Sequence, residues 1–286
     1  MGGDNCCDRR SSRASVTPSF FCVLLGLSGT ASALETRPWL SDEYAFNFGT
    51  AFTYSRYHQV EGAAVQLSAP RNDRDFLLDL SFTPGAQFDM QGEIELAKTN
   101  SINWTLRSAA LQARYQMLDD ISGDPLSLTF GMNVRGAPHH FLRDVGTPYA
   151  AECNVEMSCA AGKEWSKDGM WTMRTYGFAT VGIANRGLPW TRELFVWEVN
   201  WQDTHRLSLF TAGNVGFGGQ QHVNVNHFDG WGKIQHQSVD LGVAYGYHFF
   251  LYGTLSVSYA YRLFAHNFPE RVNAFALSYC VPFSLF

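Results

Sequence analysis

The sequence lacks an apolar run long enough to cross a membrane as a helix. Its continuous apolar run, Phe20 to Leu27, is far shorter than the roughly 20 residues that a spanning helix needs. Three arginines precede this run, and residues 31–33 (Ala-Ser-Ala) follow it with the small side chains that a signal peptidase recognises. These features predict a cleaved signal peptide over residues 1–33, so that the mature chain begins at Leu34.

The chain is also poor in cysteine and in net charge. With a formal net charge of -5 and scattered basic residues, it has no basic stripe of the kind that follows a nucleic-acid backbone, which argues against a nucleic-acid partner. Three of the six cysteines precede the predicted cleavage site. Cys153 and Cys159 flank a short polar stretch and are candidates for a disulfide in an oxidising compartment, with two free thiols as the alternative. Cysteine and histidine do not stand at the spacing of a zinc site, so we expect no metal and no cofactor.

Aromatic residues and glycine, in contrast, are plentiful and follow a strand-like alternation. Phe, Trp and Tyr make up 15% of the chain and there are 26 glycines, a composition typical of aromatic-rich strands joined by glycine-containing turns. From Tyr44 to Tyr54, large apolar side chains alternate with small or polar ones, which places the two kinds on opposite faces of a strand. The same alternation recurs over residues 76–82, 88–96, 126–134, 239–249, 251–263 and 275–285. Weaker patterns predict four more strands, over residues 109–117, 171–183, 195–201 and 207–217.

The charged residues within the seven clear stretches all fall in the row opposite the apolar one. They are Asp79, Asp89, Glu93, Glu95, Asp240 and Arg262. Chance would segregate six charges in this way roughly once in 64 trials. A Lys or Arg that faces lipid near the bilayer midplane costs about 2 to 4 kcal/mol, so a membrane barrel keeps its outer row free of charge. The pattern therefore predicts an all-β fold, a transmembrane antiparallel up-and-down β-barrel whose apolar row faces lipid.

A soluble lipocalin-like barrel would need the opposite orientation, with large aromatic side chains crowded into a lumen that eight strands barely enclose. Membrane barrels of this type use an even number of strands. A twelfth strand is therefore expected and is assigned to residues 222–232. This gives about 12 strands, within a range of 10 to 14, in one domain over residues 34–286. A long surface loop is expected at about residues 136–168.

The chain ends Ser284-Leu285-Phe286. Here it resembles the bacterial outer-membrane β-barrel family of small porin-like type, whose closing strand ends in an aromatic residue. The resemblance covers the signal peptide, the alternating body and the final strand. In that family the terminal Phe belongs to the apolar row, whereas here the row runs through Leu285, so Phe286 joins it only if Pro282 introduces a bulge.

The resemblance implies a place in the bacterial outer membrane with loops at the cell surface. It also implies contact with outer-membrane lipid and lipopolysaccharide and assembly by the barrel-insertion machinery. A homo-oligomer is compatible with this architecture.

The leading functional hypothesis is a porin-like channel that transports small hydrophilic solutes or ions. The inner rows of the last strands carry mostly small residues, which leaves space in the lumen. Acidic residues on adjacent strands would form one wall and arginines elsewhere its counterpart, and facing walls of opposite sign orient polar solutes. In the alternative interpretation these charges pair across a closed lumen and only stabilise the barrel. The expected pore-lining residues are Asp79, Asp89, Glu93, Glu95, Arg114, Arg135, Asp240 and Arg262.

Two further functions stay open as alternatives. The long loop favours a surface-exposed adhesin or structural barrel, since long loops often carry binding. His236 and Ser238 share one face of a predicted strand, with Asp240 in the same row, as base, nucleophile and orienting acid of a lipid hydrolase. The spacing resembles the His-x-Ser pair of outer-membrane phospholipases and lipid A deacylases. The residues after Ser238 do not match those enzymes, however, and this row is expected to face the lumen rather than lipid, so an enzyme is not the leading expectation.

Overall fold

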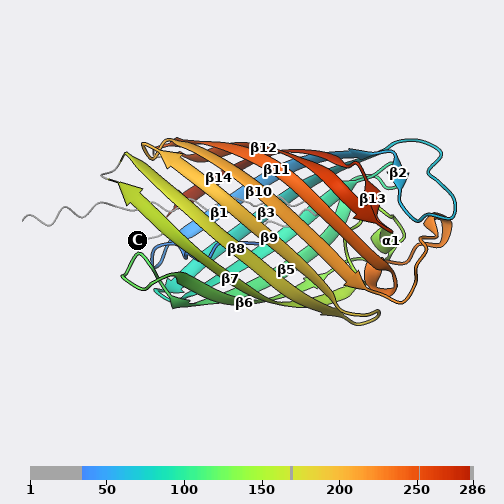
Figure 1. Cartoon of the computed structure of the whole chain (residues 1–286), viewed down its shortest axis with the longest axis horizontal. Helices are drawn as coiled ribbons and strands as arrows, with labels where there is room; N and C mark the ends of the chain where they lie inside the picture. The colour runs from blue at the N-terminus through green and yellow to red at the C-terminus, as the bar shows by residue number, and fades with distance from the viewer. Residues whose placement is uncertain (1–33, 168–169, 251, 284–286) are drawn as a thin grey trace, which may run out of the picture.

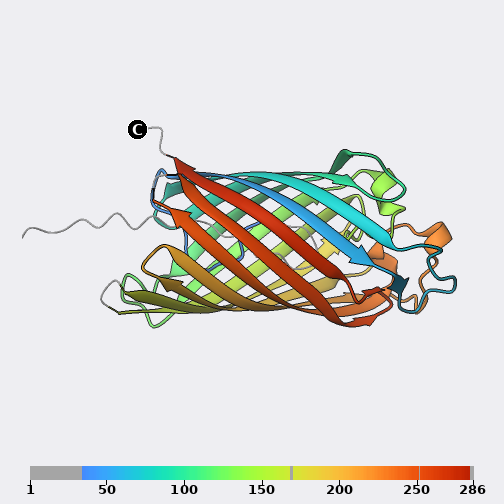
Figure 2. The same ribbon diagram turned by 90° about the horizontal axis from the view of Figure 1, so that it is seen from above.

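The computed structural model describes residues 34–167, 170–250 and 252–283. The predicted signal peptide and Phe286 lie outside these residues. Within the described chain, twelve antiparallel strands form a closed barrel in which β1 pairs with β14 (Figures 1 and 2). The barrel strands are β1 (Phe46–Tyr57), β3 (Arg71–Gly85), β4 (Phe88–Lys98), β5 (Thr105–Leu118), β6 (Ser127–Gly136), β7 (Cys153–Lys167), β8 (Trp171–Ala184), β9 (Trp190–Trp201), β10 (His205–Phe217), β11 (Gln235–Phe249), β12 (Gly253–His266) and β14 (Asn273–Phe283).

The short elements all lie in the connections between barrel strands. They are β2 (Gln59–Val60) and β13 (Pro269–Glu270), which pair with each other, the helix α1 (His139–Leu142), and the 3-10 turns η1 (Val225–His227) and η2 (Trp231–Lys233). A search of the described residues finds no helix with the length and apolar character needed to span a membrane.

The apolar rows face outward, as the alternation predicts. Along β11, Val239, Leu241 and Val243 are exposed, while Ser238 and Asp240 of the opposite row are buried. Successive side chains of a strand point to opposite faces, so this pattern gives the barrel an apolar outer surface and a polar inner one. That arrangement suits a barrel embedded in lipid.

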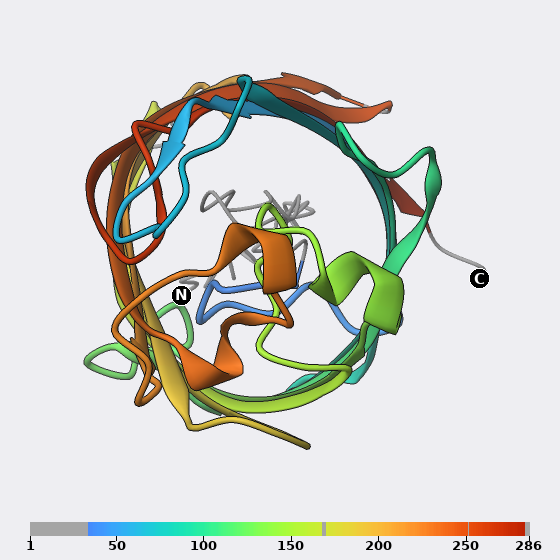
Figure 3. The same ribbon diagram turned by 90° about the vertical axis from the view of Figure 1, so that its right-hand side faces the viewer.

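The two ends of the barrel differ in their connections. One end, called here the short-turn end, carries brief turns such as the one between β9 and β10, together with the described ends of the chain (Figure 1). The other, the long-loop end, carries loops over residues 58–70, 137–152 and 218–234. The last two fold over and into the barrel mouth (Figure 3). An apolar cluster holds the long loops together, with Val60, Val145, Val223, Trp231 and Phe268 among its buried members.

Twelve strands are confirmed, but one of them was predicted in the wrong place. Residues 222–232, predicted as a strand, instead contain η1 and η2. The missing strand is β7, which occupies the second half of the segment predicted as a long surface loop at 136–168 and reduces that loop to residues 137–152. Over residues 158–162 (Ser-Cys-Ala-Ala-Gly), β7 has small side chains on both faces, so its alternation is weak there. The count stays at twelve, because one predicted strand is a loop and one predicted loop contains a strand.

The closing pair of strands contains no bulge at Pro282. The register of β1 with β14 runs without a break from Phe46 opposite Phe283 to Arg56 opposite Asn273. Pro282 lies beyond Cys280, the last residue of β14 that pairs with β12. Its missing N–H therefore costs no hydrogen bond to that neighbour.

Candidate functional site

The predicted lumen-facing charges all point inward and are buried. Asp79 lies on β3, and Asp89, Glu93 and Glu95 lie on β4. The remaining ones are Arg114 on β5, Arg135 on β6, Asp240 on β11 and Arg262 on β12. Their common orientation follows from the period-two row that the sequence revealed.

Arg114 and Arg135 lie beside the acidic residues rather than opposite them. Arg114 donates to both carboxylate oxygens of Asp89 on the neighbouring strand, 2.9 Å from Nε to Oδ1. Arg135 bonds Glu93, one strand further away. On the other side of the barrel, Arg262 forms a two-pronged pair with Asp240, at 2.7 and 2.9 Å. The sequence predicted acidic and basic walls that face each other across the lumen. The structure instead pairs the acidic residues with arginines on nearby strands of the same wall.

Arg107 is a lumen residue that the sequence pattern missed. Its guanidinium lies 3.0 Å from Asp75 and 2.5 Å from the fully buried Glu95. A bulge in the pairing of β4 with β5 leaves Arg107 without its own partner, so that Arg107 and Ser108 both point inward and both bond Glu95. The strand predicted at 109–117 begins two residues after Arg107, and a bulge breaks the two-residue period on which the prediction depends.

Most of the segment before the first strand, residues 34–43, lies inside the barrel, as Figure 3 shows for the blue part of the chain, whereas Asp42 and Glu43 are exposed. The wall formed by β4 to β6 holds its backbone. The Glu35 N–H donates to Gln91 at 2.8 Å, Arg114 donates to the Arg37 carbonyl at 2.6 Å, and Thr129 donates to the Pro38 carbonyl at 2.5 Å. The alternation begins after this segment, at Tyr44, so the place of the segment in the lumen was not predicted.

The side chains of this segment reach other parts of the barrel. Arg37 lies 3.0 Å from Glu198 of β9, and Trp39 donates to Asp120 at 2.8 Å in the turn between β5 and β6. Trp39 also packs edge-on against Tyr176 with 5.8 Å between ring centres, among buried residues of β8 to β10. The segment therefore crosses the lumen near the short-turn end and narrows it.

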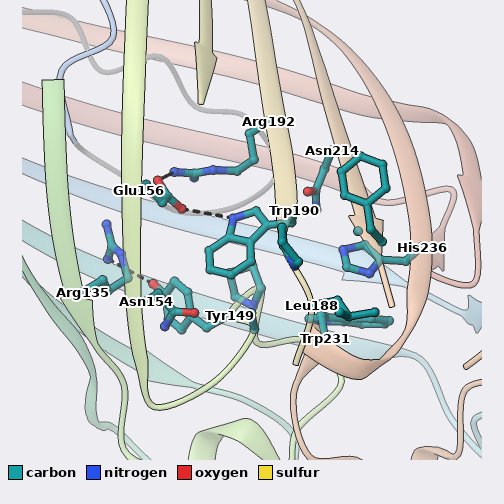
Figure 4. A pocket seen from close by; sticks show the side chains of 16 residues that line it. Arg135, Tyr149, Asn154, Glu156, Leu188, Trp190, Arg192, Asn214, Trp231 and His236 are labelled. Carbon is teal, nitrogen blue, oxygen red and sulfur yellow. Dashed lines mark hydrogen bonds and ion pairs between the residues drawn. The ribbon is translucent and has the colours of Figure 1, made fainter. Parts of the chain in front are cut away.

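A pocket lies in the other half of the lumen, below the long loops (Figure 4). It is a small cavity of about 30 Å³ that is partly open to solvent. Its polar lining comes from β6, β7, β9, β10 and β11, and its aromatic lining includes residues from the loops at 137–152 and 218–234. The main lining residues are Arg135, Tyr149, Asn154, Glu156, Trp190, Arg192, Asn214, Trp231 and His236.

Glycine makes room for the rings on this wall. A Cβ at Gly182 of β8 would lie 2.2 Å from the Trp190 ring, and one at Gly216 of β10 would lie 2.2 Å from the His236 ring. Both rings can thus lie flat against the neighbouring strand, because neither glycine has a side chain. Because these two rings lie against the wall and do not extend into the lumen, the space of the pocket stays open.

The candidate hydrolase residues do not form a catalytic array. His236 and Ser238 are buried on the inward face of β11, away from lipid. The His236 ring stacks on Phe268 and its Nδ1 lies 2.9 Å from the Ile234 carbonyl, while Asp240 is paired with Arg262. Among the described residues, the hydrogen bonds of these groups do not link His236 to Ser238 or to Asp240.

The proposed disulfide between Cys153 and Cys159 is wrong. Both thiols are free and both residues belong to β7. Six residues of extended strand separate their Cα atoms by about 20 Å, whereas a disulfide requires about 7 Å or less. Among the described residues, no group of His, Cys, Asp or Glu is arranged to hold a metal ion.

Comparison with known proteins gives a structural likeness only. The sequence matches no protein-family profile and no curated protein sequence. The fold resembles the COG4313 outer membrane channel from Pseudomonas putida F1, with a TM-score of 0.62 and 12% sequence identity over 86% of this chain and 97% of that one. The NanC porin is also similar, at a TM-score of 0.49 and 11% identity over 82% of this chain and 98% of that one. The chain thus has the fold of a small, porin-like outer-membrane β-barrel.

Proposed function

We propose that this protein is an outer-membrane channel for small hydrophilic solutes. The observation that carries the proposal is a closed barrel of twelve strands whose inner face is polar and charged, with a small cavity beneath the long loops. A barrel of eight strands has an interior just wide enough for its own side chains, and more strands leave room for solute. An adhesin or structural barrel would not need such a space.

The orientation in the membrane follows from the connections. In barrels of this class the short turns lie in the periplasm and the long loops face outward. We therefore place the long-loop end at the bacterial cell surface and the segment 34–43 on the periplasmic side. Export by a cleaved signal peptide, assembly by the insertion machinery, and contact with lipid and lipopolysaccharide belong to this proposal.

The route through the lumen has a wide part and a narrow part. Solute would enter from the surface into the pocket and then meet the N-terminal segment, which Arg37 joins to Glu198. The charges along this route are largely paired within the walls, as in Arg114 with Asp89 and Arg262 with Asp240. Low conductance and weak ion selectivity are expected, since paired charges produce a small net field.

Single-channel recording of refolded residues 34–286 in a planar lipid bilayer tests the proposal. Small, reproducible current steps are expected. Replacing Asp89 with Asn leaves the Arg114 charge without its partner and should shift selectivity toward anions, whereas Arg114→Gln should shift it toward cations. Glu270→Gln, in the loop before β14, is the control and should change neither property. A barrel that migrates as folded on an unheated gel but never conducts would contradict a channel.

A further inference from the structure

The lipid-facing surface of the barrel carries a group of cations at its long-loop end. Arg56 of β1, Arg74 of β3 and Lys98 of β4 lie on the outward rows of three adjacent strands. Figure 2 shows β1 in blue and β3 in cyan side by side. The outward rows are otherwise apolar over most of their length, so this group of cations stands apart from its surroundings.

Acidic side chains do not neutralise these cations. On the outward rows of the described strands, Glu193 of β9 is the one Asp or Glu, and β9 lies on the opposite side of the barrel from β3. Arg74 is exposed and Lys98 is half-buried. Within the described part of the chain, neither side chain forms a hydrogen bond or an ion pair. Both positive charges are therefore available to a partner outside the barrel.

The strand register brings two of these cations together. Arg74 stands directly opposite Lys98 in the pairing of β3 with β4. Arg56 stands opposite Asn72 and is therefore diagonal to Arg74. Like charges that stand directly opposite each other destabilise a sheet. An anion between Arg74 and Lys98 removes this repulsion, so the pair favours a negatively charged ligand.

The pair lies at the outer edge of the apolar band. The ten residues from Phe88, at the short-turn end of β4, to Lys98 span about 34 Å of strand. At a strand tilt of about 40° this is about 26 Å along the membrane normal, and the apolar band of such barrels is about 25 Å tall. Lys98, and Arg74 opposite it, therefore lie at the level of the lipid headgroups.

Exposed apolar side chains lie next to the pair. Trp104, in the connection after β4, is exposed, and tryptophan is enriched at membrane interfaces. Leu106 of β5 is also exposed and stands opposite Leu96, the next outward residue of β4 after Lys98. These leucines lie on the membrane side of Lys98. A ligand that carries an anionic headgroup above acyl chains fits both the cations and the apolar surface.

We propose that Arg74 and Lys98 bind a phosphate of the phosphorylated glycolipid that anchors lipopolysaccharide in the outer leaflet. Arg can donate two parallel N–H groups to phosphate oxygens, and Lys adds a compact positive charge. The proposal rests on the proposed function for the orientation that places the long-loop end at the cell surface. Binding of the lipid does not require conduction, so the two can be measured separately.

Native mass spectrometry of refolded residues 34–286 in detergent tests the proposal, because it counts the lipid molecules bound to each barrel. The probes are lipid A with both of its phosphates and the same lipid after removal of both phosphates. Saturable binding of one phosphorylated molecule is expected, with the dephosphorylated lipid at least about tenfold weaker. Equal binding of the two lipids, or no saturable binding of the phosphorylated one, would overturn the proposal.

Variants on two strands locate the site. Arg74→Gln and Lys98→Gln should each weaken binding about fivefold, which is the effect of losing one cation near an anionic lipid surface. The double variant should bind about 25-fold more weakly. All of these variants should fold, because each substitution removes one of two repelling charges. Folding is checked by the mobility of the unheated protein on a gel.

Lys167→Gln is the matched control, since it makes the same change on the outward row at the short-turn end of β7. It should bind lipid A as the parent chain does. Unchanged binding by the folded double variant would place the lipid elsewhere. An equal loss of binding in Lys167→Gln would show that the barrel attracts the lipid by its general charge, and either result would overturn the site.

Conductance recordings in a bilayer without lipopolysaccharide separate the two proposals. A chain that conducts salt but binds no lipid A would retain the channel and lose the lipid site. A chain that binds lipid A with the expected dependence on Arg74 and Lys98, yet never conducts, would support the site and overturn the channel.

Discussion

Arg37 of the N-terminal segment lies 3.0 Å from Glu198 of β9, and both side chains are buried inside the barrel. Burial alone would lower the pKa of Arg37, but Glu198, together with Tyr176 and Glu35, raises it above its ordinary value. The guanidinium therefore stays charged, and the segment is held in the lumen by an ion pair. This contact joins the N-terminal segment, which is not part of a barrel strand, to the barrel wall. The segment thereby narrows the lumen.

Replacing Arg37 with Ala should loosen the segment. Loss of one partner from a buried ion pair typically costs about 3 to 5 kcal/mol. Arg206 and Arg174 remain within 3.7 and 4.0 Å of Glu198, so we expect a smaller loss, about 1 to 3 kcal/mol. A segment that leaves the lumen widens the route, and single-channel conductance should rise about twofold or more. Arg56→Ala, at an exposed position on β1, serves as the control, and equal conductance in both variants would show that the segment does not constrict the channel.

Arg107→Gln should destabilise the barrel strongly. The substitution leaves the fully buried Glu95 and the buried Asp75 without the guanidinium that joins them. A destabilisation of about 3 to 5 kcal/mol is expected, since uncompensated charges remain inside the wall. Urea unfolding of the refolded barrel in lipid vesicles measures it, with Arg74→Gln on the exposed row of β3 for comparison. A change below about 1 kcal/mol, the usual value for a surface pair, would contradict the role given to Arg107.

The hydrogen bond between Trp39 and Asp120 should make the stability of the barrel sensitive to acid. Burial alone would raise the pKa of Asp120, but hydrogen bonds from Ser127, the Glu164 N–H and Trp39 hold it below its usual value. A carboxylate with a lowered folded-state pKa stabilises the fold above its unfolded value of about 3.9, and this contribution disappears as the pH falls through the lower folded-state value.

Asp120→Asn should therefore be less stable than the parent chain at pH 7, by about 1 kcal/mol because the site is partly exposed. The difference should shrink as the pH falls below about 4. Urea midpoints of both proteins between pH 2 and pH 7 give the comparison. A constant difference across that range would mean that the Asp120 charge does not contribute.

Cys153 should be the thiol that reacts at the cell surface. It is exposed and begins β7 at the long-loop end, whereas Cys159 lies further along the same outward row, toward the bilayer interior. A membrane-impermeant maleimide applied to intact cells, without reductant, should label the protein. Cys153→Ser should abolish the labelling, and Cys159→Ser should leave it unchanged. The reverse dependence, or labelling that requires a reductant, would contradict the strand assignment or the proposed orientation.

The sequence predicted the outer surface and the inner charges better than it predicted contacts. The inward rows that carry Asp79, Asp89 and Glu93 were recognised because charged side chains that face lipid destabilise the barrel. Charges are therefore confined to every second residue of a strand. The exposed position of Leu241 and the buried one of Asp240 both follow from that period. The strand β7 was missed where small residues on both faces remove the contrast.

From the sequence alone, the fold class and the facing of the strands could be determined, because alternation is local and depends on which side chains face lipid. The strand number needed the even-number rule as well, and the twelfth strand was assigned to the wrong segment. Only the tertiary structure decided that Arg114 and Arg135 pair within their own wall, that a bulge turns Arg107 inward, and that residues 34–43 lie inside the barrel. It also decided that Arg74 and Lys98 stand opposite each other on the outer face. These relationships depend on which strands are neighbours, on their register and on the paths of the loops, and no periodic pattern in one segment carries that information.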